Sequence, residues 1–321
     1  MCAFRSKPCH AVRGLAVLLA AAGARAHAVE FAQVTSTAYA VTSWNSEPAW
    51  SPDGTLIAYT HATLQGSQEE FTSTLEVVIL AGRRSRTVAG QATGAPLTLN
   101  SHPTWSPDGR RIAFSTNAAL WITGDTDEAP AALAVEHRGD KCPAWSPDGS
   151  MIAFESALHG IVNIWVIPAD GGEATRLESR GHVARNPTWS PDGTRVAFAS
   201  RRSGDYDIWT MPVGGGYAHQ VTTDRADDTH PSWSPDGSMI AFTSKRSGNA
   251  DIWIISSKGG EATRLTAHPA EDVEPDWSPD GSRIAFTSAR SGRLQIWVAF
   301  DLPPANLVLR SWRQPRRKLE H

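Results

Sequence analysis

The sequence predicts an all-β fold, a six-bladed β-propeller of four-stranded antiparallel blades. Two observations lead to this prediction. The phrase Pro-x-Trp-Ser-Pro-Asp-Gly occurs six times, with its tryptophan at Trp50, Trp105, Trp145, Trp189, Trp233 and Trp277. The last four of these tryptophans are 44 residues apart. An internal repeat of this length is typical of stacked units such as propeller blades.

The first residues have the pattern of a secretory signal peptide. Arg5, Lys7 and Arg13 precede an apolar run at residues 15–22, and small residues end the segment at Ala28. The apolar run is too short to cross a bilayer. We therefore expect a signal peptide at residues 1–28, a propeller at 29–309 and a basic tail at 310–321. The expected location is periplasmic or secreted, with no membrane span.

The net charge limits the classes of partner that we expect, and the cysteine content limits the possible disulfides. Without residues 1–28 the chain has 26 Lys and Arg against 33 Asp and Glu, a formal charge of −7. This balance argues against a nucleic-acid partner. The basic tail is expected to be a solvated end. Cys142 would be the one remaining cysteine, so no internal disulfide is expected and stability must come from packing. We expect a monomer.

The phrase Ser-Pro-Asp-Gly predicts a tight hairpin turn. Proline presets φ at the first corner, aspartate hydrogen-bonds nearby backbone, and glycine takes the left-handed position. We therefore assign a structural role to the six turn aspartates, Asp53, Asp108, Asp148, Asp192, Asp236 and Asp280. The six tryptophans of the phrase are suited to filling the space between blades.

The fifth repeat illustrates the blade. A short strand ends at Trp233, and strands are expected at 239–244, 251–256 and 261–266. A second tryptophan follows the first by 20 residues in repeats three to six and is missing from repeat one. One such sheet buries too little surface alone, but six of them stacked around an axis bury both faces. Repeats one and two are expected to be less regular.

The last repeat has no obvious outer strand, because its Gly-Gly turn is replaced by "DLPPAN". Near the other end of the chain, residues 33–35 (Gln-Val-Thr) resemble residues 220–222 of the fourth repeat. We expect residues 31–36 to complete the last blade and close the ring, which removes an open edge. The alternative is closure by "ANLVLR" from Ala305.

The best candidate site is the residue before each Pro-x-Trp, where the innermost strands begin. These residues are Glu47, His102, Cys142, Asn186, His230 and Glu274. A six-fold ring places His102 opposite His230, with Glu274 beside His230. Imidazole and carboxylate bind divalent metals, so His102, His230 and Glu274 form a candidate metal site. The alternative is a wetted channel without a cofactor, whose mouth binds a partner through Glu47, His102, Asn186, His230, Glu274 and Asp276.

Other charged residues are given structural interpretations. Arg202 with Asp207, and Arg246 with Asp251, are expected to pair across the second hairpin turn, whereas Arg290 faces an uncharged Gln295. The acidic residues at 227–228 and 271–276 are expected to be solvated loop charges.

The repeat "PxWSPDGxxIAFxSxRxGxxDIWxxxxxGGxxxxLT", nearly complete at residues 186–222 and 230–266, resembles that of TolB-type six-bladed propellers, relatives of WD repeats. TolB itself has an α/β domain before its propeller, and only about 20 residues separate Val29 from Trp50, too few for that domain. The resemblance implies a periplasmic binding module, with a peptidoglycan-associated lipoprotein of a Tol-Pal-like system as partner. The same repeat also occurs in prolyl-oligopeptidase-like peptidases and oligogalacturonate lyases.

The resemblance favours a non-catalytic protein-binding or scaffolding role, which requires no motif that the sequence lacks. A peptidase of that family needs a hydrolase domain with a Gly-x-Ser-x-Gly elbow, which the sequence does not contain. No Walker loop, His-Glu-x-x-His helix or paired Cys-x-x-Cys occurs. The alternative function is a metal-dependent carbohydrate lyase or hydrolase working in the channel.

Overall fold

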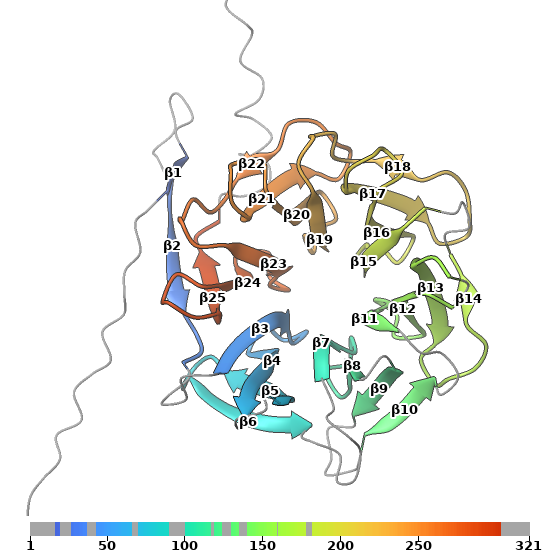
Figure 1. The fold of residues 1–321 in the computed structure, drawn as a ribbon, viewed down its shortest axis with the longest axis horizontal. Coiled ribbons are helices and arrows are strands. Elements are labelled where there is room, and N and C mark those ends of the chain that lie inside the picture. The colour runs from blue at the N-terminus through green and yellow to red at the C-terminus, as the bar shows by residue number, and fades with distance from the viewer. Residues whose placement is uncertain are drawn as a thin grey trace, which may run out of the picture.

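The computed structural model describes residues 17–19, 27–36, 43–65, 70–89, 100–116, 119–123, 130–134, 140–158, 160–177 and 182–302. These residues form six antiparallel sheets arranged around a central axis (Figure 1). The described part of the chain consists of strands, turns and loops and contains no helix. The predicted all-β, six-bladed propeller is therefore confirmed.

The blades are numbered one to six in chain order, each with its first strand innermost. Blade one has β3 (Ser43–Trp50), β4 (Leu56–Gln65), β5 (Glu70–Ile79) and β6 (Arg84–Ala89). Blade two has β7 (Asn100–Trp105), β8 (Ile112–Thr116), β9 (Ala119–Thr123) and β10 (Ala131–Ala134). Blade three has β11 (Lys141–Trp145), β12 (Met151–Ser156), β13 (Asn163–Pro168) and β14 (Thr175–Arg176).

The other three blades follow the same plan. Blade four has β15 (Ala184–Trp189), β16 (Arg195–Ser200), β17 (Asp207–Pro212) and β18 (His219–Gln220). Blade five has β19 (Asp228–Trp233), β20 (Met239–Ser244), β21 (Asp251–Ser256) and β22 (Thr263–Arg264). Blade six has β23 (Asp272–Trp277), β24 (Ile284–Ser288), β25 (Gln295–Phe300) and, from the other end of the chain, β2 (His27–Gln33) with β1 (Val17–Leu19) at its edge. The outer strand β22 is shorter than the six residues predicted from the sequence.

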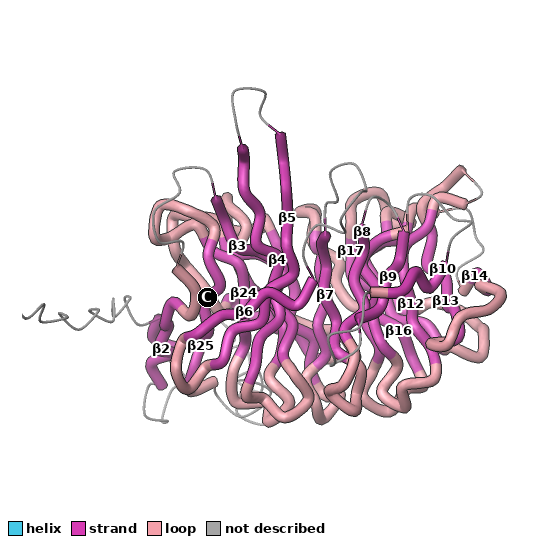
Figure 2. The backbone as a smooth tube through the Cα atoms, turned by 90° about the horizontal axis from the view of Figure 1, so that it is seen from below, coloured by secondary structure: helices cyan, strands magenta, loops and turns pink. Residues whose placement is uncertain are grey.

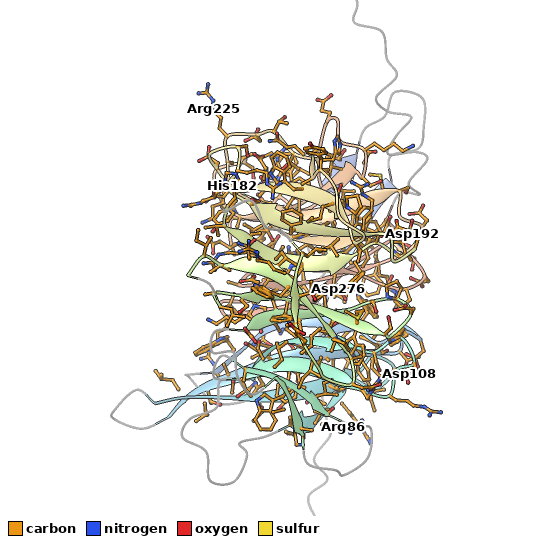
Figure 3. The ribbon with its side chains drawn as sticks, turned by 90° about the vertical axis from the view of Figure 1, so that its right-hand side faces the viewer. Arg86, Asp108, His182, Asp192, Arg225 and Asp276 are labelled. Atoms are coloured by element: carbon orange, nitrogen blue, oxygen red, sulfur yellow. The ribbon has the colours of Figure 1, made fainter. Side chains whose placement is uncertain are left out.

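Each Ser-Pro-Asp-Gly phrase forms the turn between the first two strands of a blade. In the third turn the Gly149 N–H donates to the Ser146 carbonyl at 2.9 Å, with φ of 74° at the glycine. Asp148 accepts the Ser146 hydroxyl at 2.6 Å and the Ser150 N–H at 3.0 Å, and these bonds lower the pKa of Asp148 to about 2. Figure 3 shows Asp108 and Asp192, from two other turns, on the same face of the ring.

The hydrophobic cores lie between neighbouring blades. One core joins Phe198 of blade four to Ile164 of blade three, and both side chains are fully buried. The tryptophans of the turn phrase also bridge blades, since Trp189 Nε1 donates to the Ala144 carbonyl at 3.0 Å and Trp105 Nε1 to the Ala49 carbonyl at 3.2 Å. Trp50 Nε1 makes the same kind of bond with the Asp276 carbonyl, whereas Nε1 of Trp145, Trp233 and Trp277 has no hydrogen-bond partner among the described residues.

Residues near the start of the chain close the ring, as predicted. Strand β2 pairs antiparallel with β25 from Glu30 opposite Phe300 to Gln33 opposite Trp297, and Val34 N–H donates to the Ile296 carbonyl at 2.8 Å. The two strands lie side by side in Figure 1. The competing segment from Ala305 lies outside the described residues.

Strand β1 lies within the segment predicted to be a signal peptide. It pairs with β2 only through His27 to Val29, at the predicted end of that segment. The ladder between β2 and β25 begins at Glu30, beyond the predicted cleavage point. Removal of residues 1–28 would leave this ladder intact, while the signal peptide itself stays a prediction.

Blade one is the least regular blade, as the spacing of its repeat predicts. Its middle strands β4 and β5 have ten residues each, against five or six for the middle strands of the other blades. The described ends of this hairpin project beyond the ring (Figure 2).

The predicted pairing of Arg246 with Asp251 is wrong. Arg246 pairs with Asp228 at 2.6 Å, and Asp251 pairs with Arg264 at 2.6 Å. Antiparallel pairing of β19 with β20 places Asp228 opposite Ser244, two residues before Arg246. The innermost strand, β19, therefore places Asp228 beside Arg246.

Two related predictions also fail. Arg290, expected to lack a charged partner, pairs with Asp272 at 2.6 Å. Asp228 and Asp272 lie in strands with no exposed surface and are not solvated loop charges. In blade four, Arg202 lies over the rings of Phe198 and Trp209, and Asp207 accepts hydrogen bonds from Ser203, Gln220 and Thr222.

Candidate functional site in the central channel

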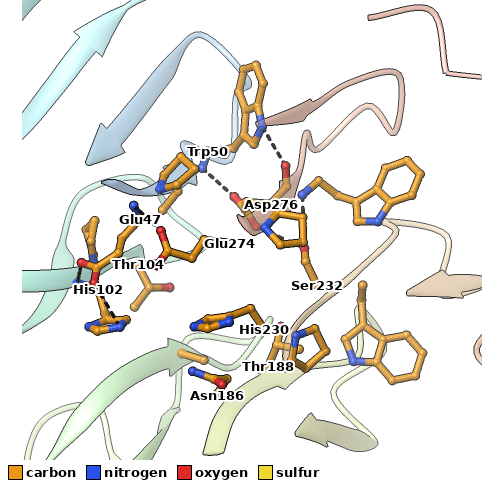
Figure 4. A pocket seen from close by; sticks show the side chains of 18 of the residues that line it. Glu47, Trp50, His102, Thr104, Asn186, Thr188, His230, Ser232, Glu274 and Asp276 are labelled. Carbon is orange, nitrogen blue, oxygen red and sulfur yellow. Dashed lines mark hydrogen bonds and ion pairs between the residues drawn. The ribbon is translucent and has the colours of Figure 1, made fainter. Parts of the chain in front are cut away.

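A cavity of about 310 Å³ lies on the axis of the ring. Its wall includes all six residues that precede Pro-x-Trp, namely Glu47, His102, Cys142, Asn186, His230 and Glu274. Figure 4 shows the side chains of Glu47, His102, His230 and Glu274 directed toward the same space. The structure therefore brings the predicted ring residues together around one cavity.

The backbone at these six positions has an unusual conformation. Their φ angles lie between 50° and 58°, in the left-handed region that residues other than glycine seldom adopt. Each position falls at a register shift between the first two strands of its blade, for example between Ser46 and Ala49 in blade one. A β-bulge re-aims a side chain, and here the bulge accompanies a side chain that lines the channel. Such strain costs about 1–3 kcal/mol per residue and clusters at functional sites.

Glu47 and His102 form a pair across the boundary between blades one and two. His102 Nε2 lies 3.2 Å from Glu47 Oε1, and the His102 backbone N–H donates to Glu47 Oε2 at 2.6 Å. The Thr60 hydroxyl also donates to Glu47 Oε2, at 2.8 Å. The structure thus places His102 against its neighbour Glu47, a contact that the sequence did not predict.

Glu274 is held in a similar way at the boundary between blades six and one. Its Oε2 accepts the Thr287 hydroxyl at 2.8 Å and the Glu47 backbone N–H at 3.0 Å. The Glu47 N–H also points at the Thr287 hydroxyl oxygen, at 3.0 Å. Both channel carboxylates are therefore fixed by donors in the wall.

Sequence reasoning missed the residues on the second strands that support the ring. The Asn186 N–H donates to Glu155 Oε1 at 2.6 Å, and the Glu274 N–H donates to the Thr243 hydroxyl at 3.0 Å. The residues that make such contacts each lie 13 positions after a ring residue, and they are Thr60, Glu155, Thr243 and Thr287.

Burial favours the uncharged form of His230, the second histidine of the ring. Its Nδ1 lies 3.1 Å from the Thr229 hydroxyl oxygen. Burial lowers the pKa of His230, the charge of Glu274 opposes this shift and that of His102 reinforces it. A neutral imidazole has one nitrogen that donates a hydrogen bond and one that accepts a hydrogen bond.

Asp276 lies one level further along the channel and links three blades. Its Oδ2 accepts the Trp50 N–H of blade one at 2.8 Å, and its Oδ1 accepts the Ser232 hydroxyl of blade five at 3.3 Å. Burial raises the pKa of Asp276 to about 6, although these two donors favour the charged form. Figure 4 shows Asp276 beside Trp50 and Ser232 in the lining of the cavity.

Blades three and four supply the less charged side of the channel. The Asn186 side-chain amide lies 3.7 Å from Cys142 Sγ, in the range of a weak hydrogen bond. Burial raises the pKa of Cys142, and the nearby Glu155 carboxylate adds to this shift. The cysteine is therefore a thiol and not a reactive thiolate.

The geometry gives little support to the predicted metal site. Among the described residues, no group of three or more His, Cys, Asp or Glu is arranged to hold a metal ion. His102 is turned toward Glu47, while Glu274 is bound by Thr287 and by backbone. The three predicted ligands line one cavity without forming one coordination site.

The fold and this wall define a class of protein, a six-bladed β-propeller with a polar axial cavity. Residues 32–187 match the TolB beta propeller domain, and residues 204–311 match the Tricorn protease N-terminal beta propeller domain. The predicted resemblance of the repeat to TolB-type propellers is therefore confirmed. A comparison with curated proteins gives no match.

Solved structures agree with this assignment. A putative TolB from Agrobacterium tumefaciens is 26% identical, with a TM-score of 0.61, and the match covers 67% of this chain and 77% of that one. TolB from Acinetobacter baumannii is 18% identical, with a TM-score of 0.58 over 80% of this chain and 63% of that one. An oligogalacturonate lyase in complex with manganese is 14% identical, with a TM-score of 0.58 over 86% and 94%. The last two comparisons show the fold alone.

The described residues include no helix with the length and apolar character needed to cross a membrane.

Proposed function

We propose that the chain is an exported, non-catalytic propeller that binds another protein and acts as a scaffold in the cell envelope. The match of residues 32–187 to the TolB beta propeller domain supports this role. The resemblance to TolB implies a periplasmic partner, and a peptidoglycan-associated lipoprotein of a Tol-Pal-like system is the first candidate. The signal peptide expected at residues 1–28 supports export.

One observation carries the proposal: the polar groups of the channel wall hold one another in place. Glu47 is bound by Thr60 and His102, and Glu274 is bound by Thr287 and the backbone of Glu47. A wall fixed in this way loses little conformational entropy when a partner binds. The channel wall is therefore a preformed surface that a partner can recognise.

The test is direct binding to a purified partner. The chain from residue 29 onward is immobilised and exposed to periplasmic extract. The lipoprotein of the same species, or any captured protein, is then purified and titrated calorimetrically. We expect one-to-one binding by the wild type. Thr188→Trp, which fills the cavity, should abolish it, whereas Thr223→Trp, at an exposed position, should not. Absence of any stoichiometric envelope partner would contradict the proposed function.

A second candidate is a metal-dependent carbohydrate lyase or hydrolase. An oligogalacturonate lyase solved with manganese shares the fold, and His102, His230 and Glu274 line the cavity here. If these residues hold a divalent ion, manganese, zinc or calcium should raise the melting temperature by mass action. His102→Ala with His230→Ala should remove that rise. No rise in the wild type would exclude this candidate.

A further inference from the structure

Blade one ends in an open strand on the outer rim of the ring. β6 is the last strand of its sheet, and no other strand of the described residues lies on its outer side (Figure 1). It has six residues, whereas the outer strands of blades two to five have between two and four. Residues 84–87 are all exposed, so solvent reaches both faces of this strand. An open strand of this kind is a template on which another strand can pair.

The register of blade one shows which backbone groups of β6 are available. The Leu80 N–H donates to the Thr55 carbonyl, so the backbone groups of Leu80 face β4. Successive residues of a strand alternate between the two neighbouring strands, so those of Val78 face β4 as well. Ser85, the partner of Val78, and Thr87 therefore direct their N–H and C=O groups away from β5. Two residues of β6 thus offer free strand hydrogen bonds to solvent.

The side chains of this edge carry positive charge. Arg86 lies opposite Val77, on the face of blade one toward blade two, and Arg84 lies two residues away on the same face. Arg83, in the preceding turn, is also exposed. None of these three arginines forms an ion pair with the described residues. They form a basic edge on a chain whose residues after 28 have a formal charge of −7.

We propose that β6 binds an extended acidic segment of a second protein, which adds to blade one as an antiparallel fifth strand. Its backbone pairs with Ser85 and Thr87, and acidic residues at alternate positions lie opposite Arg84 and Arg86. Residues opposite each other there form non-hydrogen-bonded pairs, with Cα atoms about 4.5 Å apart and side chains close enough for ion pairing. In strand addition the main-chain bonds provide affinity and alternate side chains provide specificity.

Two features favour a peptide strand over an anionic lipid surface. The arginines of β6 are spaced as alternate residues of a strand, and the free backbone groups lie between them. A lipid headgroup would use the arginines and leave the backbone groups unpaired. This edge is on the outer rim and not in the channel, so the inference does not rest on the proposed function.

The experiment compares three peptides that differ in charge or in one backbone donor. The first is acetyl-Val-Thr-Glu-Thr-Glu-Thr-Val-amide, the second has glutamine in place of both glutamates, and the third has an N-methyl group on the central threonine. Each labelled peptide is titrated with the mature chain, residues 29–321, and binding is measured by fluorescence anisotropy. We expect the first peptide to bind at least about fivefold more tightly than either analogue, because one lacks the charges and the other lacks a strand hydrogen bond.

Two results would overturn the inference. If the N-methyl peptide binds as well as the first, the arginines attract negative charge without adding a strand. If the first peptide binds no better than the glutamine peptide, or does not bind at millimolar concentration, the arginines only protect the edge from pairing.

Two double variants locate the binding. Arg84→Gln with Arg86→Gln removes the charges that face the added strand and should weaken binding of the first peptide by about fivefold or more. Arg225→Gln with Lys258→Gln removes two exposed charges elsewhere and should leave the affinity unchanged. Figure 3 shows Arg225 at the opposite end of the molecule from Arg86. An equal loss in both variants, or none in the first, would overturn the assignment to β6.

Vesicles of phosphatidylglycerol test the other source of negative charge. We expect the wild type and the variant with Arg84→Gln and Arg86→Gln to cosediment with these vesicles to the same small extent. Strong cosedimentation of the wild type that the variant loses, together with no binding of the acidic peptide, would assign the arginines to a membrane surface and overturn the proposal.

Discussion

Blades five and six share one plan for their inner strands but obtain their outer strand in different ways. In blade five, β22 follows β21 after a turn of the same chain segment. In blade six the outer strand is β2, from the other end of the chain. Both blades contain a buried ion pair of 2.6 Å, Asp228 with Arg246 and Asp272 with Arg290. The inner strands of the two blades are therefore built alike, and the differences lie in the outer strand.

One side-chain contact of the outer segment is nevertheless the same in both blades. In blade five the Ile252 N–H donates to the Thr266 hydroxyl at 3.0 Å, and in blade six the Ile296 N–H donates to Thr35 at the same distance. The Thr35 hydroxyl donates in turn to Gln295 Oε1 at 2.9 Å. A local side-chain pattern, and not continuity of the chain, thus specifies the outer strand.

Strand β2 compensates for the missing covalent connection with more contact. It forms four residue pairs with β25, whereas β22 forms two with β21. Phe31 packs edge-on against Phe286 and lies under the Arg290 guanidinium. Val34 lies in the core shared with blade one. One strand therefore seals two boundaries between blades.

Deletion of residues 29–36 should have the largest effect on stability. Val29, Phe31 and Val34 are all buried, and burial of each side chain contributes about 1.5–3 kcal/mol. We expect a loss of at least about 4 kcal/mol in the free energy of unfolding, measured with urea, once the lost hydrogen bonds are included. Deletion of residues 310–321 is the control. An unchanged urea midpoint would show that another segment closes the ring.

Breaking the buried ion pairs should have similar effects in the two blades. Asp272→Ala and Asp228→Ala each leave an arginine without its carboxylate, and each should cost about 3–5 kcal/mol. The measurement is urea denaturation at neutral pH, with the exposed Asp205→Ala as the control. A much smaller loss for Asp272→Ala would mean that blade six is assembled less tightly than blade five.

The two threonines provide a closer comparison. Thr35→Val and Thr266→Val keep the shape of the side chain and remove the oxygen that accepts from the next strand. Each should cost about 1–2 kcal/mol, because a buried backbone N–H is left unsatisfied. Equal losses in thermal and urea unfolding would support the equivalence of β2 and β22. A loss for Thr266→Val alone would refute it.

Asp276, which joins blade six to blades five and one, should give the smallest effect. Its folded pKa of about 6 is above its ordinary value of 3.8, so its contribution to stability is present at low pH and is lost as pH rises through 6. Relative to Asp276→Asn, the wild type should gain on the order of 1–2 kcal/mol between pH 7 and pH 4. The check is the difference between the two unfolding free energies across that range. A flat difference would contradict the raised pKa.

The sequence predicts the ring well because its signals are local. The turn phrase contains both partners of its hydrogen bonds within five residues, as Ser146, Asp148 and Ser150 show. Closure was predictable for the same reason, since residues 33–35 repeat the outer-strand pattern of blade four. The residues that line the channel are also predictable, because each one directly precedes a Pro-x-Trp phrase.

Contacts between strands were harder to predict. Asp251, the predicted partner, is five residues from Arg246, whereas Asp228, the observed partner, is 18 residues away. The pairing of β19 with β20 reverses that order. The contact of His102 with Glu47 joins neighbouring blades and residues 55 positions apart, so no local pattern predicts it. The role of Thr60 becomes visible only when the strand register is known.

Formation of one engineered disulfide tests the closure of the ring most directly. Ala32 and Val298 are paired across β2 and β25, and Cα atoms of such pairs are about 5.5 Å apart, within reach of a disulfide. The variant Ala32→Cys with Val298→Cys is oxidised in the folded state and digested. We expect mass spectrometry to find one cross-linked peptide joining residues 32 and 298. Two free thiols at these positions in the folded, oxidised protein would contradict closure by the N-terminal strand.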